Sequence, residues 1–222
     1  MSSFSSNFTN RDYDVKIGNY FSRGWEIFKQ KAPLFVLFTL MLFLIQVVIA
    51  ILPYPLGSRS DEPVPGGILS FAFNVVAPAL TAGYYFVAFQ LARGRDAVFG
   101  DFFQGFNKFL PIFLTALVTG ILTAIGFVLL VIPGVYLAVA YLFAQPFVID
   151  KSADFWQAME TSRQLITKKW FSFFGLLLML FLLNLAGAIV LGIGLLVTVP
   201  LTVCIVAAAY EDIVGLNSVA EI

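Results

Sequence analysis

Six apolar stretches of about 20 residues each constrain this chain more than any other feature. A helix of that length crosses a hydrocarbon layer of about 30 Å, and lipid requires every backbone polar group to be hydrogen-bonded within its own segment. Only 12% of the residues are charged, about half the share typical of soluble domains. We therefore expect an all-α polytopic membrane protein with six transmembrane helices. The stretches are residues 34–52, 68–91, 109–131, 133–150 and two within 171–210.

Three amphipathic segments precede the first, third and fifth apolar stretches. They cover residues 15–31, 98–108 and 153–169, and their apolar side chains recur at helical spacing on one face. Aromatic rings favour the boundary between membrane and water. A helix packed against the protein's own cytosolic ends would give the same pattern. The candidate interfacial anchors are Tyr20, Phe21, Trp25, Phe102, Phe103, Phe106, Phe155, Trp156 and Trp170.

The chain reads as three copies of one unit, in which an amphipathic helix is followed by a span, a turn and a second span. The Asp-Phe-Phe-Gln sequence at 101–104 matches Asp-Phe-Trp-Gln at 154–157. In the second arm of each unit a proline occupies a corresponding place, at Pro78, Pro133 and Pro200. These matches predict three hairpin repeats.

The repeats set the expected domain organisation. The units cover about residues 14–93, 97–150 and 153–212 of a single membrane domain, 14–212. Residues 1–13 are rich in Ser and Asn, so we expect a disordered tail. Residues 213–222 form a short cytosolic tail, and the Pro- and Gly-rich residues 53–67 form an aqueous loop.

Proline and glycine mark the expected hinges at Pro78, Pro133, Gly134 and Pro200. Proline is tolerated in the first turn of a helix, whereas deeper in a helix it removes a backbone hydrogen bond and kinks it. We expect a tight turn at Pro133-Gly134. We expect a kink or a broken helix at Pro78 and Pro200.

The distribution of positive charge predicts the orientation. Of the 13 Lys and Arg residues, all but Arg59 fall in the N-terminal segment or in the segments 93–108 and 151–169. Cytosolic segments carry the excess of positive charge, so both termini should face the cytosol. Acidic residues on the same side nearly cancel the basic ones, which favours aromatic and apolar anchoring over recognition of anionic lipids.

The chain lacks residue types on which several kinds of catalysis and metal binding usually depend. The chain has no histidine, a single cysteine at Cys204 and a formal net charge of zero. We therefore expect no enzyme activity, no cofactor, no metal and no nucleic-acid partner. Paired carboxylates such as Glu211-Asp212, and Asp150 beside Lys151, could bind a divalent metal or transfer protons. Solvated helix ends are the favoured interpretation.

Polar residues within the spans leave two alternatives open. Thr115, Thr119 and Thr123 recur every four residues, with Gly120 and Gly126 nearby. They could line a hydrophilic path. The favoured alternative is close helix packing with interhelical hydrogen bonds, since small residues mark helix contacts in membranes.

Four motifs carry a resemblance to a known family. They are Ile-Pro-Gly-Val-Tyr-Leu at 132–137, Gln-Pro-Phe-Val-Ile-Asp at 145–150, Phe-Trp-Gln-Ala at 155–158 with Ser162, and Pro200-Leu201 followed by Ala-Ala-Ala-Tyr at 207–210. They resemble the membrane domain associated with bacterial glycerophosphodiester phosphodiesterases and related stand-alone bacterial integral membrane proteins.

The resemblance implies a six-span helical domain in a bacterial inner (plasma) membrane. In the enzymes of that family, catalysis belongs to a separate soluble barrel domain. The chain has no room for this barrel and none of its metal ligands, so no catalytic residue carries over.

Two functions remain. The first is a non-catalytic membrane-embedded scaffold or partner-binding module, whose partners are the lipid bilayer and other membrane proteins or a second copy in a homo-oligomer. The alternative is a small channel, transporter or lipid-handling protein with a path between the proline-broken hairpins.

Overall fold

The computed structural model describes residues 8, 12–51, 65–190 and 192–216. Of the described residues, 85% are helical and none lies in a strand. The prediction of an all-α protein is therefore confirmed. Most of the predicted aqueous loop 53–67, and most of both predicted tails, lie outside the described residues.

The described residues contain six long apolar helical stretches, as the sequence predicts, and each is long and apolar enough to cross a membrane. The fourth consists of two shorter helices, α6 and α7. Together the six make this a membrane-embedded helical protein. The helices are α3 (Ala32–Ile51), α4 (Pro65–Ala92), α5 (Phe109–Leu129), α6 (Val131–Ala140), α7 (Ala144–Lys151), α9 (Trp170–Ile189) and α10 (Leu195–Ile213).

The three amphipathic segments form shorter helices, α2 (Ile17–Gln30), η1 (Phe99–Lys108) and α8 (Phe155–Thr167). The middle one, η1, is a 3₁₀-helix. The Asp101 carboxylate caps its start, accepting a 2.8 Å hydrogen bond from the Val98 N–H. An acidic group in the first turn also complements the positive end of a helix dipole.

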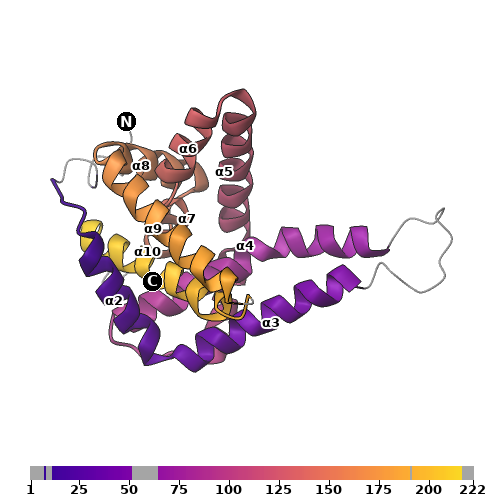
Figure 1. Ribbon diagram of the computed structural model, residues 1–222. Helices are drawn as coiled ribbons and strands as arrows, with labels where there is room; N and C mark the ends of the chain where they lie inside the picture. The colour runs from indigo at the N-terminus through magenta and orange to yellow at the C-terminus, as the bar shows by residue number, and fades with distance from the viewer. Residues whose placement is uncertain (1–7, 9–11, 52–64, 191, 217–222) are drawn as a thin grey trace.

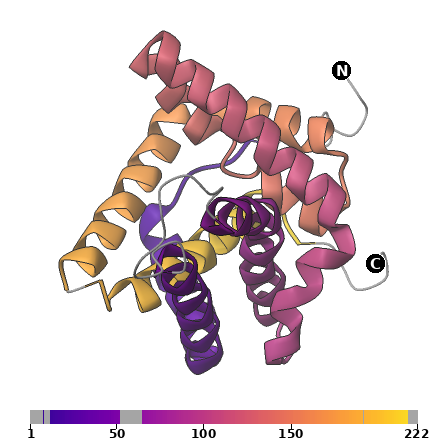
Figure 2. The same ribbon diagram turned by 90° about the vertical axis from the view of Figure 1, so that its right-hand side faces the viewer.

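The long helices diverge from a common base in three directions. In Figure 1, α3 and α4 project together to the right, whereas α5 rises with α6 beside it. The junction of α9 and α10 points elsewhere again, as the turned view in Figure 2 shows. Hydrophobic residues at these far ends are among the most exposed in the chain, including Val128 at 86% and Ile132 at 81%.

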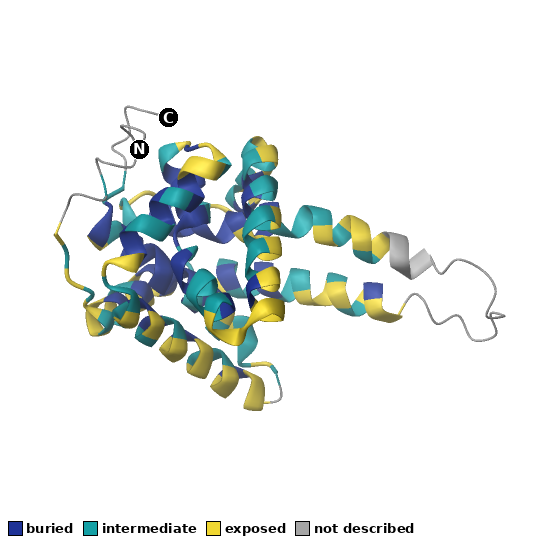
Figure 3. Cartoon of the chain, turned by 90° about the horizontal axis from the view of Figure 1, so that it is seen from above, coloured by how far each residue is buried: buried dark blue, intermediate teal, exposed yellow. Residues whose placement is uncertain are grey.

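The core lies at the opposite, near ends of the helices, where buried residues concentrate (Figure 3). Aromatic rings fill its centre. The ring of Tyr210 on α10 lies 5.5 Å from Phe89 on α4, 5.5 Å from Phe143 and 5.3 Å from Phe147 on α7. The contacts with Phe143 and Phe147 are edge-to-face, a geometry that stabilises beyond simple burial.

The predicted turn at Pro133-Gly134 is displaced. The chain turns at Leu130, whose backbone is extended, and both predicted residues lie in the first turn of α6. Proline is tolerated there because first-turn N–H groups have no helical partner. Gly134 instead permits close packing, because a Cβ added at Gly126 of α5 would lie 2.9 Å from the Cα of Gly134.

The helices α4 and α10 run without a break through Pro78 and Pro200. Of the two predicted alternatives, a broken helix is therefore not observed at either proline, and a kink within a continuous helix stays a prediction. Pro200 is buried in the core, where tertiary packing offsets the backbone hydrogen bond that proline removes.

The break in the second arms occurs instead between α6 and α7, at Tyr141–Phe143. Pro146 lies in the first turn of α7, so it cannot donate the hydrogen bond that would join the two helices. The buried Ser162 hydroxyl on α8 compensates. It donates to the Ala140 carbonyl over 2.7 Å and accepts from the Phe143 N–H over 3.1 Å.

Candidate functional site

A buried ionic cluster joins the near ends of three helices. Asp150 on α7 has a fully buried side chain and is paired with Arg93 at the end of α4. Lys151 Nζ lies 3.1 Å from the same carboxylate, and the Tyr210 hydroxyl on α10 donates to it over 3.4 Å. The cluster therefore ties α4, α7 and α10 together at one carboxylate.

The charges of this cluster are strongly coupled. A carboxylate removed from water is costly unless cations and hydrogen-bond donors surround it. The Arg93 side chain is only 14% exposed and that of Lys151 only 10%. Lys151 also donates to the Gly215 carbonyl over 2.9 Å. Removing the carboxylate would leave two cations close together and largely desolvated.

The amphipathic helix α2 makes a second polar link across the near ends. Arg23 donates to both carboxylate oxygens of Glu211, over 3.2 and 3.1 Å, and to the Ala92 carbonyl over 3.2 Å. The hydrogen bond to Glu211 raises the pKa of Arg23. Tyr20 donates to Asp212 over 3.1 Å, and burial raises the pKa of Tyr20 to about 12.

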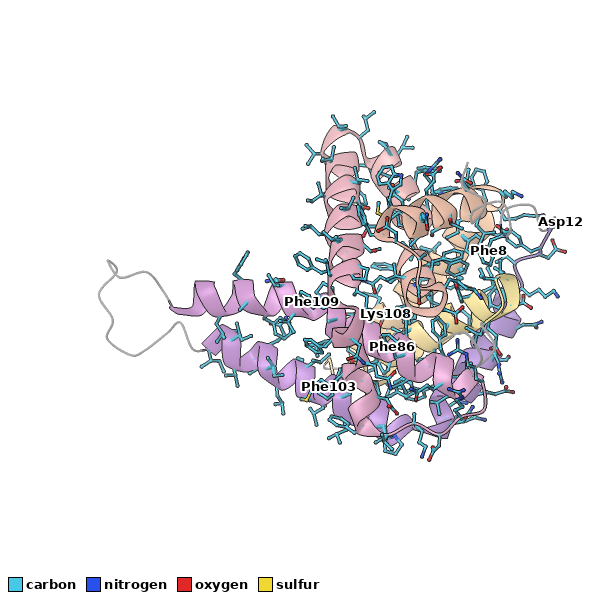
Figure 4. The ribbon with its side chains drawn as sticks, turned by 180° about the vertical axis from the view of Figure 1, so that it is seen from behind. Phe8, Asp12, Phe86, Phe103, Lys108 and Phe109 are labelled. Atoms are coloured by element: carbon cyan, nitrogen blue, oxygen red, sulfur yellow. The ribbon has the colours of Figure 1, made fainter. Side chains whose placement is uncertain are left out.

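The start of the chain also contacts the near ends. The Phe8 ring packs edge-on against Phe147 with centroids 5.5 Å apart, and Tyr13 donates to the Leu165 carbonyl over 2.6 Å. Figure 4 shows Phe8 and Asp12 on the side of the molecule away from the projecting ends of α3 and α4. Both residues belong to the segment that the sequence predicts to be disordered, most of which lies outside the described residues.

The candidate carboxylates all have partners, but only Asp150 is buried, whereas Glu211 is half-buried and Asp212 is exposed. Asp150, Glu211 and Asp212 each interact with a basic or tyrosine side chain. Within the described ranges, no cluster of His, Cys, Asp and Glu could hold a metal ion. The predicted repeat places Arg93 and Asp150 at corresponding ends of two units, but it does not predict that the two side chains meet.

Two candidate interfacial anchors are buried, which corrects the prediction for them. Tyr20 is 2% exposed and Phe102 is fully buried, so both pack inside the protein instead of contacting lipid. Phe102 stacks on Phe38 with centroids 4.3 Å apart. The exposed anchors are Trp25, Phe103, Phe106 and Trp156, and the half-buried ones are Phe21, Phe155 and Trp170.

The threonine stripe of α5 is satisfied mainly within its own helix. Thr115 and Thr119 donate to carbonyls one turn earlier, over 2.8 and 2.7 Å. A Cβ at Gly120 would meet nothing within 4 Å, whereas Gly126 packs against Gly134. Close helix packing is therefore observed at Gly126, where α5 contacts α6. Thr119 and Gly120 instead border a hollow beside α6.

A groove of about 570 Å³ separates α3 and α4 from the start of α10. Most of its lining is apolar, but Gln46 and Thr39 of α3 and Tyr84 of α4 also contribute. The hydroxyls of Thr39 and Tyr84 are hydrogen-bonded to each other over 2.8 Å. No sequence motif indicates this groove, because it forms between segments distant in the chain.

No protein-family model matches the chain, and neither a curated protein nor a solved structure matches it. The similarity to the membrane domain of glycerophosphodiester phosphodiesterases therefore stays a prediction from sequence motifs.

Proposed function

We propose that the protein is a non-catalytic scaffold or partner-binding module embedded in a bacterial inner membrane. One observation carries this proposal. Three pairs of apolar helices diverge from a single buried core, and their far ends present apolar side chains that have no partner surface within the described chain. Large exposed apolar surfaces mark sites that contact lipid or other proteins.

The proposed architecture is three hairpin repeats, with α3/α4, α5/α6–α7 and α9/α10 as the arms. Corresponding ends of the second arms, at Arg93, Asp150 and Tyr210, converge on one cluster, which a threefold repeat would produce. Both termini are proposed to be cytosolic, because the basic residues lie at the near ends.

A scaffold also agrees with how the polar groups are used. The carboxylates at the near ends bind the protein's own cations, so they stabilise the fold. The interfacial residues Trp25 and Trp156 remain exposed at 46% and 59%, where they can hold the near ends at the membrane surface.

Site-specific photocrosslinking in native membranes tests the proposal. We place a photoreactive phenylalanine analogue at Leu44 or Phe181, which are 53% and 61% exposed on the long helices, and at buried Phe173 as the matched control. We expect discrete adducts with other membrane proteins at the exposed positions only. Adducts with lipid alone, or only with a second copy of the chain, would contradict a scaffold for other proteins.

The second candidate is a small channel, transporter or lipid-handling protein, and the groove beside α3 favours it. Because α4 and α10 are not broken at Pro78 and Pro200, a path would follow this groove instead of a helix break. Solute-flux and lipid-scrambling assays in proteoliposomes distinguish the two functions. Silence across a broad panel of solutes and lipids would remove this candidate.

A further inference from the structure

The turn between α5 and α6 contains no polar side chain. Residues 125–135 are all Ile, Leu, Val, Phe, Pro or Gly, and residues 129–132 are 66% to 81% exposed. Exposed side chains of these types are favourable in hydrocarbon and costly in water. The segment that follows α3, by contrast, contains Arg59, Asp61 and Glu62. The α5/α6 turn is therefore suited to the interior of a membrane and not to its aqueous face.

The backbone of this turn is also suited to hydrocarbon. Lipid offers no hydrogen bonds, so an unpaired N–H group is costly there. The Leu130 N–H donates to the Gly126 carbonyl over 3.0 Å. Pro133 lies in the first turn of α6 and has no N–H. It thereby removes one of the donors that the start of a helix leaves unpaired.

The amphipathic helix α8 runs along α6 toward this turn, and the two helices lie beside each other in Figure 1. The Ser162 hydroxyl of α8 donates to the Ala140 carbonyl over 2.7 Å. One turn further along α8, the Thr167 and Tyr136 hydroxyls are hydrogen-bonded over 2.8 Å. The Trp170 indole N–H then donates to the Tyr136 carbonyl over 3.4 Å. The C-terminal end of α8 is therefore fixed beside Tyr136.

This end of α8 carries charge and faces water. Lys168 is exposed, and Lys169 Nζ lies 3.5 Å from the carboxylate of Asp14, whose side chain is 82% exposed. Charged side chains are costly in hydrocarbon, and lysines near it extend their ammonium groups to the water boundary. Because Tyr136 contacts Thr167, it lies close to the water boundary on the same side as the base.

The distance from Tyr136 to the turn decides whether the hairpin can cross the membrane. Leu130 precedes Tyr136 by six residues, which is about 9 Å at the helical rise. A hydrocarbon layer is about 30 Å thick, so one leaflet contributes about 15 Å. The turn therefore lies at most about 9 Å deeper than Tyr136, which is less than one leaflet.

The directions of the hairpins agree with this depth. In Figure 1, α5 and α6 point away from the direction of α3 and α4, so the two hairpins cannot both lie along the membrane normal. A tilted helix covers less of the membrane thickness than its own length. The length of α5 is thus compatible with a hairpin that does not cross.

One face of α5 supplies the apolar surface that such a position requires. Leu117, Ile121, Ile125 and Val128 recur at helical spacing and are 44% to 86% exposed. Thr119, on another face, borders the hollow beside α6. A helix with one apolar face lies in a leaflet with that face toward the acyl chains.

We propose that the α5/α6 hairpin does not cross the membrane but lies within the leaflet next to the base, where acyl chains cover its turn. The two spans that the sequence predicts at residues 109–131 and 133–150 then form one re-entrant hairpin. The proposal does not rest on the scaffold function, because partners can bind α3 or α9 whether or not this hairpin crosses.

Thiol accessibility from the two sides of the membrane tests the proposal. Leu130→Cys, Thr167→Cys, Gln157→Cys and Ser58→Cys are made in the Cys204→Ser background. Each is treated with a membrane-impermeant maleimide in right-side-out and in inside-out vesicles. Gln157→Cys reports the side of the base, and Ser58→Cys is the control for the opposite side. Complete reaction after unfolding in sodium dodecyl sulfate shows that each thiol is free.

The expected pattern follows from thiol chemistry. Maleimide reacts with the thiolate, which apolar surroundings disfavour. We expect Thr167→Cys to react from the same side as Gln157→Cys and at a similar rate. We expect Leu130→Cys to react at least about tenfold more slowly than Thr167→Cys, from both sides.

The other patterns would overturn the proposal. Rapid reaction of Leu130→Cys from the side opposite Gln157 would show that the hairpin crosses, and rapid reaction from the same side would place the turn in water. If Thr167→Cys does not react from the side of Gln157, the water boundary is not at Tyr136. If Leu130→Cys does not elute as a folded protein in micelles, Ile132→Cys replaces it.

Photocrosslinking in native membranes identifies what covers the turn. A photoreactive phenylalanine analogue replaces Val128, which is 86% exposed, or buried Phe173 as the matched control. We expect phospholipid adducts at Val128, at least about fivefold above the control. A polypeptide adduct at Val128 would overturn the assignment to lipid. The adducts that test the scaffold function form at Leu44 and Phe181 on other helices, so either proposal can fail alone.

Discussion

At the scale of single residues, Asp150 is a buried carboxylate with several charged and polar contacts. Its carboxylate is buried between the Arg93 guanidinium and the Lys151 ammonium, and the Tyr210 hydroxyl donates to it. A buried ion pair adds little compared with a well-packed apolar pair, yet breaking it leaves an uncompensated charge. We therefore expect the cluster to favour this one arrangement of the three helix ends over others.

We expect Asp150→Asn to destabilise the protein by about 3–5 kcal/mol, because two largely buried cations then lose their counter-charge. Arg93→Ala in combination should cost less than the sum of the two single changes, since the partners are coupled. Unfolding in detergent micelles measures these differences. The matched control is Arg163→Ala, which breaks the half-exposed pair with Glu160 and should cost less than about 1 kcal/mol. An Asp150→Asn variant as stable as this control would refute the role of the cluster.

The sequence indicates the residues of this cluster, but it does not predict that they contact one another. Arg93 and Asp150 are both visible at the ends of apolar stretches, and their burial depends on contacts across 57 residues of chain. Local periodicity carries no information about such separations. The same limit applies to Phe102, which lies on the apolar face of a predicted amphipathic segment but packs on Phe38 instead of lipid.

At the scale of elements, glycines set the closest helix contact. A Cβ added at Gly83 on α4 would collide with the Phe102 carbonyl, and one at Gly105 on η1 would collide with the Ala79 carbonyl. The backbones of α4 and η1 therefore touch directly, as small residues allow. This contact turns Phe102 into the core and away from the membrane surface.

We expect Gly83→Ala and Gly105→Ala each to destabilise the protein by about 1–3 kcal/mol or more, because the added methyl group meets rigid backbone. Gly100→Ala is the matched control within η1, since its Cβ would meet nothing within 4 Å. Thermal unfolding in micelles compares the three variants. If Gly105→Ala unfolds at the same temperature as Gly100→Ala, the contact is looser than the structure shows.

The positions of whole helices are easier to predict from the sequence than the points at which a helix is interrupted. The six apolar stretches and the three amphipathic segments match observed helices because hydrophobic length and period are local properties. The division of the fourth span at Tyr141–Phe143 was not predicted. Pro146 removes a hydrogen bond there, but Ser162 on another helix is needed to satisfy the Ala140 carbonyl and the Phe143 N–H, so the prolines alone could not locate the break.

At the scale of the whole molecule, the chain has a polar base and apolar projections. Ion pairs such as Arg23 with Glu211 lie at the base, whereas the far ends expose residues such as Val128 and Ile132. In a membrane, both parts are favourably solvated if the polar base faces water and the apolar projections enter the hydrocarbon layer. The proposed orientation follows from placing the basic residues on the cytosolic side.

Single-cysteine labelling tests this orientation in a Cys204→Ser background. Gln157, which is exposed at the base on α8, is a suitable site for a reporter cysteine. A second cysteine replaces Ser58, which lies between α3 and α4 outside the described residues. The reagent is a membrane-impermeant maleimide. In intact cells we expect it to label Ser58→Cys. We expect it to label Gln157→Cys only after the membrane is permeabilised, because positively charged segments stay in the cytosol. The reverse pattern would invert the proposed topology, and labelling of both positions in intact cells would exclude a common cytosolic base.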